Sequence, residues 1–175
     1  MATVNLDRRD LKFKIPSGMI ISGPSSSGKT TLLLKILENY KELFDPIPKS
    51  ILYCYSEYHS YIPLLEKSGI KICHGAPTDE MLKRLAKPML LVLDDLMLTM
   101  NDKALSELFT IKSHHQNISV IFVTQNLFEK SLRVARTNAQ YILLMRAPNA
   151  ALQIRNLVNI NQPTQKFNMN FQLDL

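Results

Sequence analysis

The chain has 175 residues, of which 46% are hydrophobic, and this size and composition fit one globular domain with a buried core. Its longest apolar runs, such as residues 89–93, fall far short of the roughly 18 to 20 residues that cross a bilayer. A secretion signal would also be apolar near the N-terminus, but residues 7–10 are all charged. We therefore expect an intracellular protein with no membrane partner. The net charge of +6 is compatible with a nucleic-acid partner but does not establish one.

The two cysteines, Cys54 and Cys73, are expected to be buried, reduced thiols. The pairs Cys73-His74 and His114-His115 lack the ligand spacing of a zinc site, so we expect no metal at either.

Short apolar runs typical of β-strands alternate with helix-like stretches along most of the chain. The predicted strands are residues 20–22, 50–55, 70–73, 89–93, 119–123 and 140–145. The predicted helices follow the phosphate loop to about residue 42, then cover 61–67, 79–86 with Thr78 as the cap, about 103–115, and a short stretch near 129–133. Continuous apolar strands in such an alternation predict an α/β fold, in which a parallel sheet is covered by helices on both faces. No repeat or composition break marks a second domain, so we expect a core at residues 1–160 and a polar C-terminal tail at 161–175 that orders only against a neighbour, if at all.

A phosphate-binding loop is the most specific motif in the chain. Gly23-Pro24-Ser25-Ser26-Ser27-Gly28-Lys29-Thr30 matches G-x-x-x-x-G-K-[ST] in full, between a predicted strand and a predicted helix that begins near Thr31. The two glycines let the loop curl so that its N–H groups point at phosphate oxygens, and the helix N-terminus adds favourable partial charge. We expect Lys29 to reach the β- and γ-phosphates and Thr30 to bind Mg²⁺, which makes ATP and Mg²⁺ the predicted cofactors. The alternative is an ordinary Ser/Gly turn, which the flanking strand and helix disfavour.

Two acids end the apolar run at residues 89–93, as in a Walker B strand. Carboxylates at the carboxyl end of a buried strand lie where open α/β sheets bind ligands. We expect Asp94 to hold Mg²⁺ through its waters and Asp95 to orient and deprotonate the attacking water. The alternative is that the pair caps the next helix.

The strand at residues 119–123 is followed by Gln125, about thirty residues after Asp95. In P-loop ATPases that use an acid as the base, an extra strand lies between the phosphate-loop strand and the Walker B strand, and a polar residue at its tip contacts the γ-phosphate and water. Gln125 fits this sensor role because an amide can donate to phosphate and accept from water. An ordinary turn residue is the alternative.

Arginines before the last strand are candidates for an arginine finger, which neutralises charge on the γ-phosphate from across a subunit boundary. Arg136 is the first candidate, with Arg133 and Arg146 in reserve. A solvated surface arginine, or an arginine facing DNA phosphates, remains an open alternative for each.

Four segments resemble a known family. Residues 23–31, residues 91–97 (LVLDDLM) and above all residues 114–128 (HHQNISVIFVTQNLF) look like the genome-packaging ATPases of large eukaryotic DNA viruses, such as poxviruses, and of Polinton-like elements. Residues 136–148 (RTNAQYILLMRAP) are similar to the family's segment before and through its last strand. These ATPases belong to the FtsK/HerA group of translocases, and the resemblance spans most of residues 16–150.

The resemblance implies a P-loop NTPase fold of the RecA/ASCE-like type and an ATP-driven, homo-oligomeric ring that pushes double-stranded DNA into a preformed capsid. Lys29, Thr30, Asp94, Asp95 and Gln125 keep the roles given above, and Arg136 becomes the finger acting in trans. The implied partners are double-stranded DNA, other copies of the chain and a capsid or portal protein. The implied location is an infected cell, in the nucleus or in a cytoplasmic virus factory, with virion association left open. One departure is that the wider group usually has Asp-Glu where this chain has Asp94-Asp95, so the identity of the base stays open.

Two other functions are compatible with the loop. A P-loop nucleoside or small-molecule kinase would need an arginine-rich lid and an acceptor pocket, and it would commonly place its second-acid strand beside the loop strand. A scaffold that binds nucleotide without hydrolysing it is disfavoured by the presence of Lys29, Asp94 and Asp95.

Overall fold

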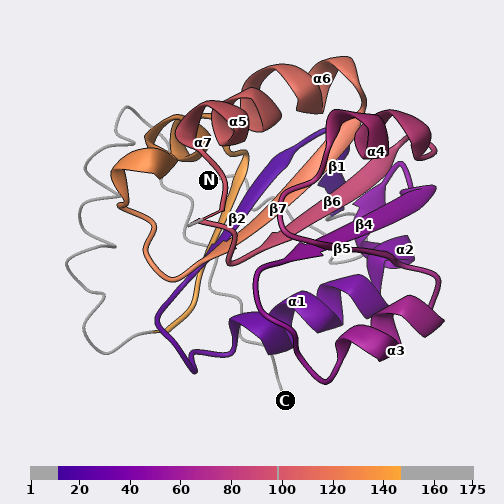
Figure 1. The fold of residues 1–175 in the computed structure, drawn as a ribbon, viewed down its shortest axis with the longest axis horizontal. Coiled ribbons are helices and arrows are strands. Elements are labelled where there is room, and N and C mark those ends of the chain that lie inside the picture. The colour runs from indigo at the N-terminus through magenta and orange to yellow at the C-terminus, as the bar shows by residue number, and fades with distance from the viewer. Residues whose placement is uncertain (1–11, 98, 147–175) are drawn as a thin grey trace, which may run out of the picture. The chain divides into compact units, whose positions relative to one another are not determined.

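The main sheet of the protein consists of six parallel strands (Figure 1). The structure is a computed structural model that describes residues 12–97 and 99–146. The strands are β2 (Gly18–Ser22), β4 (Ser50–Tyr55), β5 (Lys71–His74), β6 (Met89–Asp94), β7 (Ile118–Thr124) and β8 (Tyr141–Leu144), in the spatial order β5-β4-β6-β7-β2-β8. Contacts between Cα atoms divide the chain into two units, residues 1–145 and 146–175, and the sheet belongs to the first. Of the second unit, only the exposed Arg146 is described.

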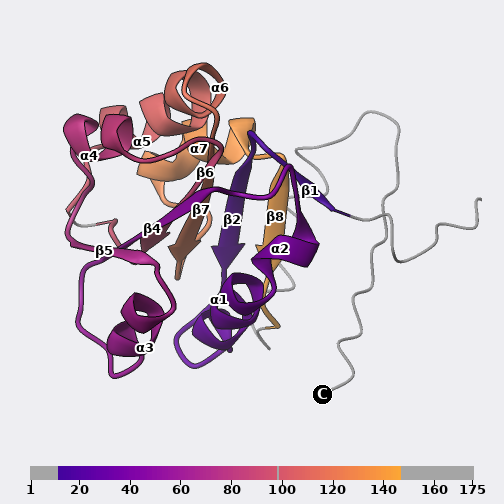
Figure 2. The ribbon, with the colours of Figure 1, turned by 90° about the vertical axis from the view of Figure 1, so that its right-hand side faces the viewer.

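Helices cover both faces of the sheet (Figures 1 and 2). One face carries α1 (Lys29–Glu38), α2 (Tyr40–Leu43) and α3 (Ile62–Lys67). The other carries α4 (Asp79–Arg84), α5 (Asp102–Glu107), a π-helical segment (Leu108–Lys112), α6 (Ser113–His115), a 3₁₀ turn (Lys130–Leu132) and α7 (Arg133–Asn138). Among these described helices none combines the length and the apolar character needed to span a bilayer.

The predicted α/β fold with a parallel sheet is confirmed. Each predicted strand is present within about two residues of its expected ends, and Thr78 caps α4 as expected by accepting a hydrogen bond from the Met81 N–H at 3.3 Å. A small second sheet was not predicted: β1 (Phe13–Lys14) pairs with β3 (Phe44–Asp45). Strands of two residues are too short to show a hydrophobic period, so sequence patterns miss them.

Helix boundaries differ more from the prediction. The helix after the phosphate loop ends at Glu38, and α2 follows it as a separate turn, while the helix expected at about 103–115 contains the π-helical segment in its middle. The short helix expected near 129–133 is a 3₁₀ turn that continues into α7. The predicted boundary between core and tail at residue 160 lies outside the described residues.

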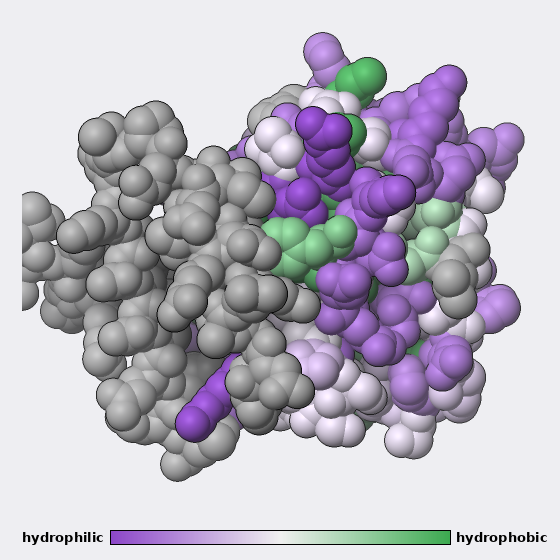
Figure 3. Space-filling model, turned by 90° about the vertical axis from the view of Figure 1, so that its left-hand side faces the viewer, coloured by the Kyte–Doolittle hydropathy of each residue, from purple (hydrophilic) through white to green (hydrophobic). Residues whose placement is uncertain are grey.

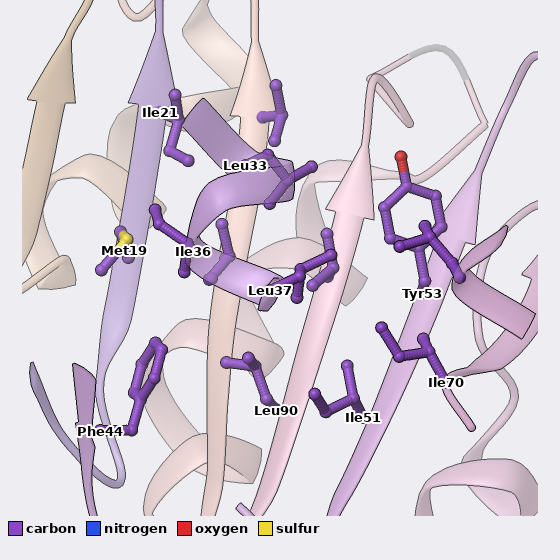
Figure 4. Packing of buried hydrophobic residues seen from close by; sticks show 14 of the residues in the cluster. Met19, Ile21, Leu33, Ile36, Leu37, Phe44, Ile51, Tyr53, Ile70 and Leu90 are labelled. Carbon is purple, nitrogen blue, oxygen red and sulfur yellow. The ribbon is translucent and has the colours of Figure 1, made fainter. Parts of the chain in front are cut away.

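The central strands are apolar because they are covered on both sides. Every residue of β2, β6 and β7 is buried, as expected for strands in the middle of a parallel sheet. Leu33, Ile36 and Leu37 recur at the spacing of one helical face and bury that face of α1 against β2, β4 and β6, as Figure 4 shows. This packing holds the start of α1, and with it the phosphate loop, at the carboxyl end of β2.

The cysteine prediction is half right. Cys54 is buried in β4, but Cys73 in β5 is only half-buried because β5 is an edge strand of the sheet. Both are free thiols.

Exposed large apolar side chains are few. On the face drawn in Figure 3, hydrophilic residues cover most of the described surface, and apolar residues form small patches. The exposed ones in the described residues are Ile47, Tyr58, Leu64, Ile111, Val134 and Leu144. Isolated exposed apolar residues of this kind are common on protein surfaces.

Candidate nucleotide-binding site

The phosphate loop connects β2 to α1 and leads directly into the first turn of that helix. Gly28 is the residue before α1 and has φ = 91°, a left-handed conformation that favours glycine. Ser26 also has a positive φ, 61°, which is uncommon for a residue with a side chain and is typical of constrained functional loops. No side chain caps α1. The N–H groups of its first turn, which have no partner within the helix, are therefore available to an anion.

Met145 follows β8 and packs closely on the loop. A Cβ atom built on Gly23 would lie 2.6 Å from Met145 Cβ and 2.8 Å from Ser27 Oγ, so only glycine fits at this position. The Ser27 hydroxyl is buried and has no hydrogen-bond partner in the part of the chain that the structure describes. A buried polar atom without a partner costs free energy, and nucleotide phosphate oxygens are acceptors that would satisfy it. The loop thus fits a phosphate group both in its shape and in its unused donors.

Lys29 lies at the start of α1, half-buried, and its Nζ donates a hydrogen bond to the Pro24 carbonyl at 2.8 Å. Burial lowers the pKa of Lys29, while the negative charges of Asp95 and Asp94 oppose that shift. Lys29 is thus close enough to Asp94 and Asp95 for their negative charges to affect its pKa. Thr30 and Thr31 follow it in the first turn of α1, where Thr30 is half-buried and Thr31 is exposed.

Asp94, Asp95 and Gln125 meet at the carboxyl edge of the sheet because β6 and β7 are neighbours, with Asp94 opposite Val123. Asp94 is buried, with 8% of its surface exposed. Asp95 is exposed, has φ = 53°, and accepts a hydrogen bond from Gln125 Nε2 at 3.4 Å on its Oδ2. The left-handed turn at Asp95 separates the two acids, so one carboxylate is buried and the other faces solvent.

The strand order places β7 between β2 and β6. Gln125 at the tip of β7 therefore lies between the phosphate loop and the Walker B acids, which is the arrangement that the sensor role requires. The roles predicted for Lys29, Asp94, Asp95 and Gln125 remain predictions, but the fold brings all four residues to one edge.

Two tyrosines at this site were missed by the sequence analysis. Tyr53 in β4 and Tyr61 just before α3 both donate to Asp94 Oδ2, Tyr61 at 3.2 Å, and their hydroxyl oxygens lie 3.1 Å apart. Burial, aided by the charge of Asp94, raises the pKa of Tyr53 well above its usual range and that of Tyr61 to about 12, so both stay protonated near neutral pH. Figure 4 shows the Tyr53 hydroxyl pointing toward the carboxyl ends of the strands, away from the apolar side chains around it. No local motif could have identified them, since their role depends on β4 lying beside β6.

The arginines lie in a different setting. Arg136 in α7 donates from Nη1 to the Leu127 carbonyl at 2.7 Å, and its guanidinium lies 5.1 Å from the centre of the Phe128 ring. Arg133, one turn earlier in the same helix, is exposed, and its guanidinium makes no ion pair or hydrogen bond with the described residues. Arg146 is exposed. Acting in trans would require Arg136 to leave its contacts with Leu127 and Phe128, whereas Arg133 would leave no such contact among the described residues.

No protein-family model matches the chain, and no curated protein sequence does. Among solved structures, the genome packaging NTPase B204 from Sulfolobus turreted icosahedral virus 2, in complex with ATP-gammaS, has a TM-score of 0.53 and 16% sequence identity, over 81% of each chain. The cytoplasmic domain of EssC has a TM-score of 0.55 and 12% identity, covering 80% of this chain but only 33% of that one. At these sequence identities, both structures are similar to this protein in fold. The protein therefore has the fold of the P-loop NTPases in which an extra strand separates the phosphate-loop strand from the Walker B strand.

Proposed function

We propose that the protein hydrolyses ATP with Mg²⁺ and uses the free energy to translocate double-stranded DNA, in the packaging of a viral genome into a capsid. The observation that carries the hydrolytic part is the meeting of Lys29, Asp94, Asp95 and Gln125 at one edge of the sheet, with β7 between β2 and β6. The packaging part is supported by the resemblance of residues 114–128 to viral packaging ATPases and by the likeness in fold to B204.

In this proposal the phosphates bind the free N–H groups of the loop and the Lys29 ammonium. Thr30 and Asp94 would hold Mg²⁺, and bound Mg²⁺ would neutralise charge that develops on the phosphates. Asp95 accepts the proton of the attacking water, which suits a carboxylate exposed to solvent. Gln125, already bonded to Asp95, orients that water through its amide.

The choice of Asp94 for the metal and Asp95 for the base follows from their surroundings. Asp94 is buried and held by two hydroxyl donors, so its carboxylate has a defined orientation. Asp95 has a single hydrogen bond from a side chain among the described residues, with Gln125, and it is accessible to water.

Double-stranded DNA, other copies of this chain in a ring, and a capsid or portal protein are the partners in this proposal, within an infected cell. The net charge of +6 favours binding to the DNA backbone, and such binding weakens with salt because counterions are released. A ring is required if the arginine finger comes from a neighbouring subunit, because the finger then completes the site of the next copy.

The kinase alternative is disfavoured by the sheet. A nucleoside or small-molecule kinase would commonly place the second-acid strand beside the loop strand, whereas here β7 intervenes between β6 and β2.

The test is the steady-state rate of ATP hydrolysis with and without long double-stranded DNA, at two salt concentrations. We expect DNA to stimulate hydrolysis at low salt and the stimulation to fade at high salt. Asp95→Asn should abolish hydrolysis and retain nucleotide binding, while Glu66→Gln, which makes the same charge change at an exposed position in α3, should behave like the wild type. If the rate of ATP hydrolysis does not change with DNA but rises when a nucleoside acceptor is added, the proposal is wrong and the kinase function is supported.

A further inference from the structure

Three oxygen atoms from three separate elements meet beside the Walker B strand. They are the hydroxyls of Tyr53 in β4 and of Tyr61 before α3, and Oδ2 of Asp94 at the end of β6. Each pair among the three is within hydrogen-bonding distance. Neither tyrosine belongs to the phosphate loop, the Walker B strand or the sensor strand.

The direction of these hydrogen bonds follows from counting protons. A carboxylate only accepts, and each protonated tyrosine has one hydrogen to donate. Tyr53 is fully buried and donates to Asp94, while the single hydrogen of Tyr61 has two acceptors within reach, Asp94 Oδ2 and the Tyr53 oxygen. Both hydroxyls are therefore placed to donate to the same carboxylate oxygen. Oδ1 of Asp94 accepts no hydrogen bond from the described residues.

We propose that Tyr53 and Tyr61 are positioning residues for metal binding: they hold Asp94 by Oδ2 and leave Oδ1 available to Mg²⁺ or to the waters bound to it. This inference rests on the proposed function, since it assumes that Asp94 is the metal-holding acid. Groups that hydrogen-bond to a ligating carboxylate fix its orientation, and their removal commonly weakens metal binding by roughly 10- to 100-fold.

The two donors differ in how they are held. Tyr53 is locked in the sheet between β5 and β6, whereas Tyr61 ends the exposed segment 57–60 and is half-buried. The His59 ring stacks on the Tyr61 ring, with centroids 5.2 Å apart and planes 15° apart, and this contact restricts the ring of Tyr61. Tyr53 thus supplies the fixed contact to Asp94, and Tyr61 supplies a second contact from the surface of the molecule.

The test compares nucleotide binding with and without Mg²⁺ in variants that lose only a hydroxyl. Binding of a fluorescent ATP analogue to the full chain is measured in EDTA and across a Mg²⁺ titration, together with the melting temperature. Tyr61→Phe and Tyr53→Phe should raise the Mg²⁺ concentration at half-maximal effect by about tenfold or more and leave the affinity in EDTA unchanged. Tyr58→Phe is the matched control, because Tyr58 lies in the same segment, is 66% exposed and does not contact Asp94.

The outcomes separate this inference from the function on which it rests. If the wild type shows Mg²⁺-dependent binding and both variants titrate like it, the tyrosines do not position the metal ligand and the inference is wrong, while the ATPase proposal stands. A lower melting temperature with an unchanged Mg²⁺ midpoint assigns the tyrosines a structural role only and also overturns it. If the wild type binds no nucleotide, the proposed function and the inference both fail. Should Tyr53→Phe not fold, the half-buried Tyr61→Phe decides the question alone.

Discussion

Replacing Gly23 by alanine tests the close packing of Met145 on the phosphate loop. The added Cβ would lie 2.6 Å from Met145 Cβ, whereas an ordinary contact needs at least 3.4 Å. Rotation of the Met145 side chain cannot relieve this overlap, because the position of a Cβ atom is set by the backbone. Both backbones are also anchored, since the Met145 N–H donates to the Ser22 carbonyl at 2.8 Å and the Gly23 N–H donates to the Thr124 carbonyl at 3.2 Å.

The expected cost is that of overpacking a tight site, about 1–3 kcal/mol in the free energy of unfolding. For a chain of this size each kcal/mol corresponds to a fall of about 2–4 °C in Tm. The second close atom, Ser27 Oγ at 2.8 Å, belongs to a side chain that can rotate, so Met145 should account for most of the loss. Met145→Gly removes the opposing Cβ, and in that background Gly23→Ala should cost at least about 1 kcal/mol less.

The assay is urea unfolding without nucleotide, for the two single variants and the double variant. Gly69→Ala serves as the control, because Gly69 has φ = 88° but no atom within 4 Å of an added Cβ. That control should cost about 1–2 kcal/mol from backbone strain, equally in both backgrounds. An equal cost for Gly23→Ala with and without Met145 would refute the reasoning, since the loop would then not depend on this contact.

Two further predictions concern subunit cooperation and pH. If Arg136 acts in trans, Lys29→Ala and Arg136→Ala subunits should each be inactive alone and regain ATP hydrolysis when mixed. No rescue at any mixing ratio would rule out Arg136 as the finger. The same experiment with Arg133→Ala in place of Arg136→Ala tests the exposed arginine. Hydrogen bonding and charge from Lys112 lower the pKa of Asp79, and Lys14 does the same for Asp45, so the folded state binds fewer protons than the unfolded state. The stabilisation is therefore present above the ordinary carboxyl pKa of 3.8 and is lost as the pH falls through the lower folded value. Asp79→Asn should flatten the fall in unfolding free energy between about pH 5 and pH 2 relative to the wild type. The Lys14–Asp45 pair is exposed, and Asp79 is exposed beside a partly buried Lys112, so salt should weaken the effect, and an unchanged slope in the variant would contradict the assignment.

The elements whose signal is local could be predicted from the sequence. Strands β2, β6 and β7 are continuous apolar runs because both faces are buried, so their composition alone predicts them. The phosphate loop is likewise a contiguous motif, and the order of its residues already implies the turn and the helix that follow. Helix ends were predicted less well, because capping and the π-helical segment depend on single residues and on packing.

The positions of the candidate site residues were partly predictable. Acids at the end of β6 and Gln125 at the end of β7 were expected to meet if β7 lay beside β6, and the sheet has that order. The contacts of Arg136 with Leu127 and Phe128 were not expected. A guanidinium has five N–H donors that can bind many kinds of acceptor, and the sequence does not show which acceptor will lie within reach.

The sequence by itself determined the phosphate loop, the parallel α/β class and the acids and amide at the strand ends, because these features are encoded by neighbouring residues. Only the tertiary structure decided that Tyr53 and Tyr61 bind Asp94 and that Met145 closes over Gly23. Those contacts join residues 41, 33 and 122 positions apart in the chain. Which residues make these contacts depends on which strands pair and on where the loops end. The sequence pattern of one segment does not show which other segment will lie beside it.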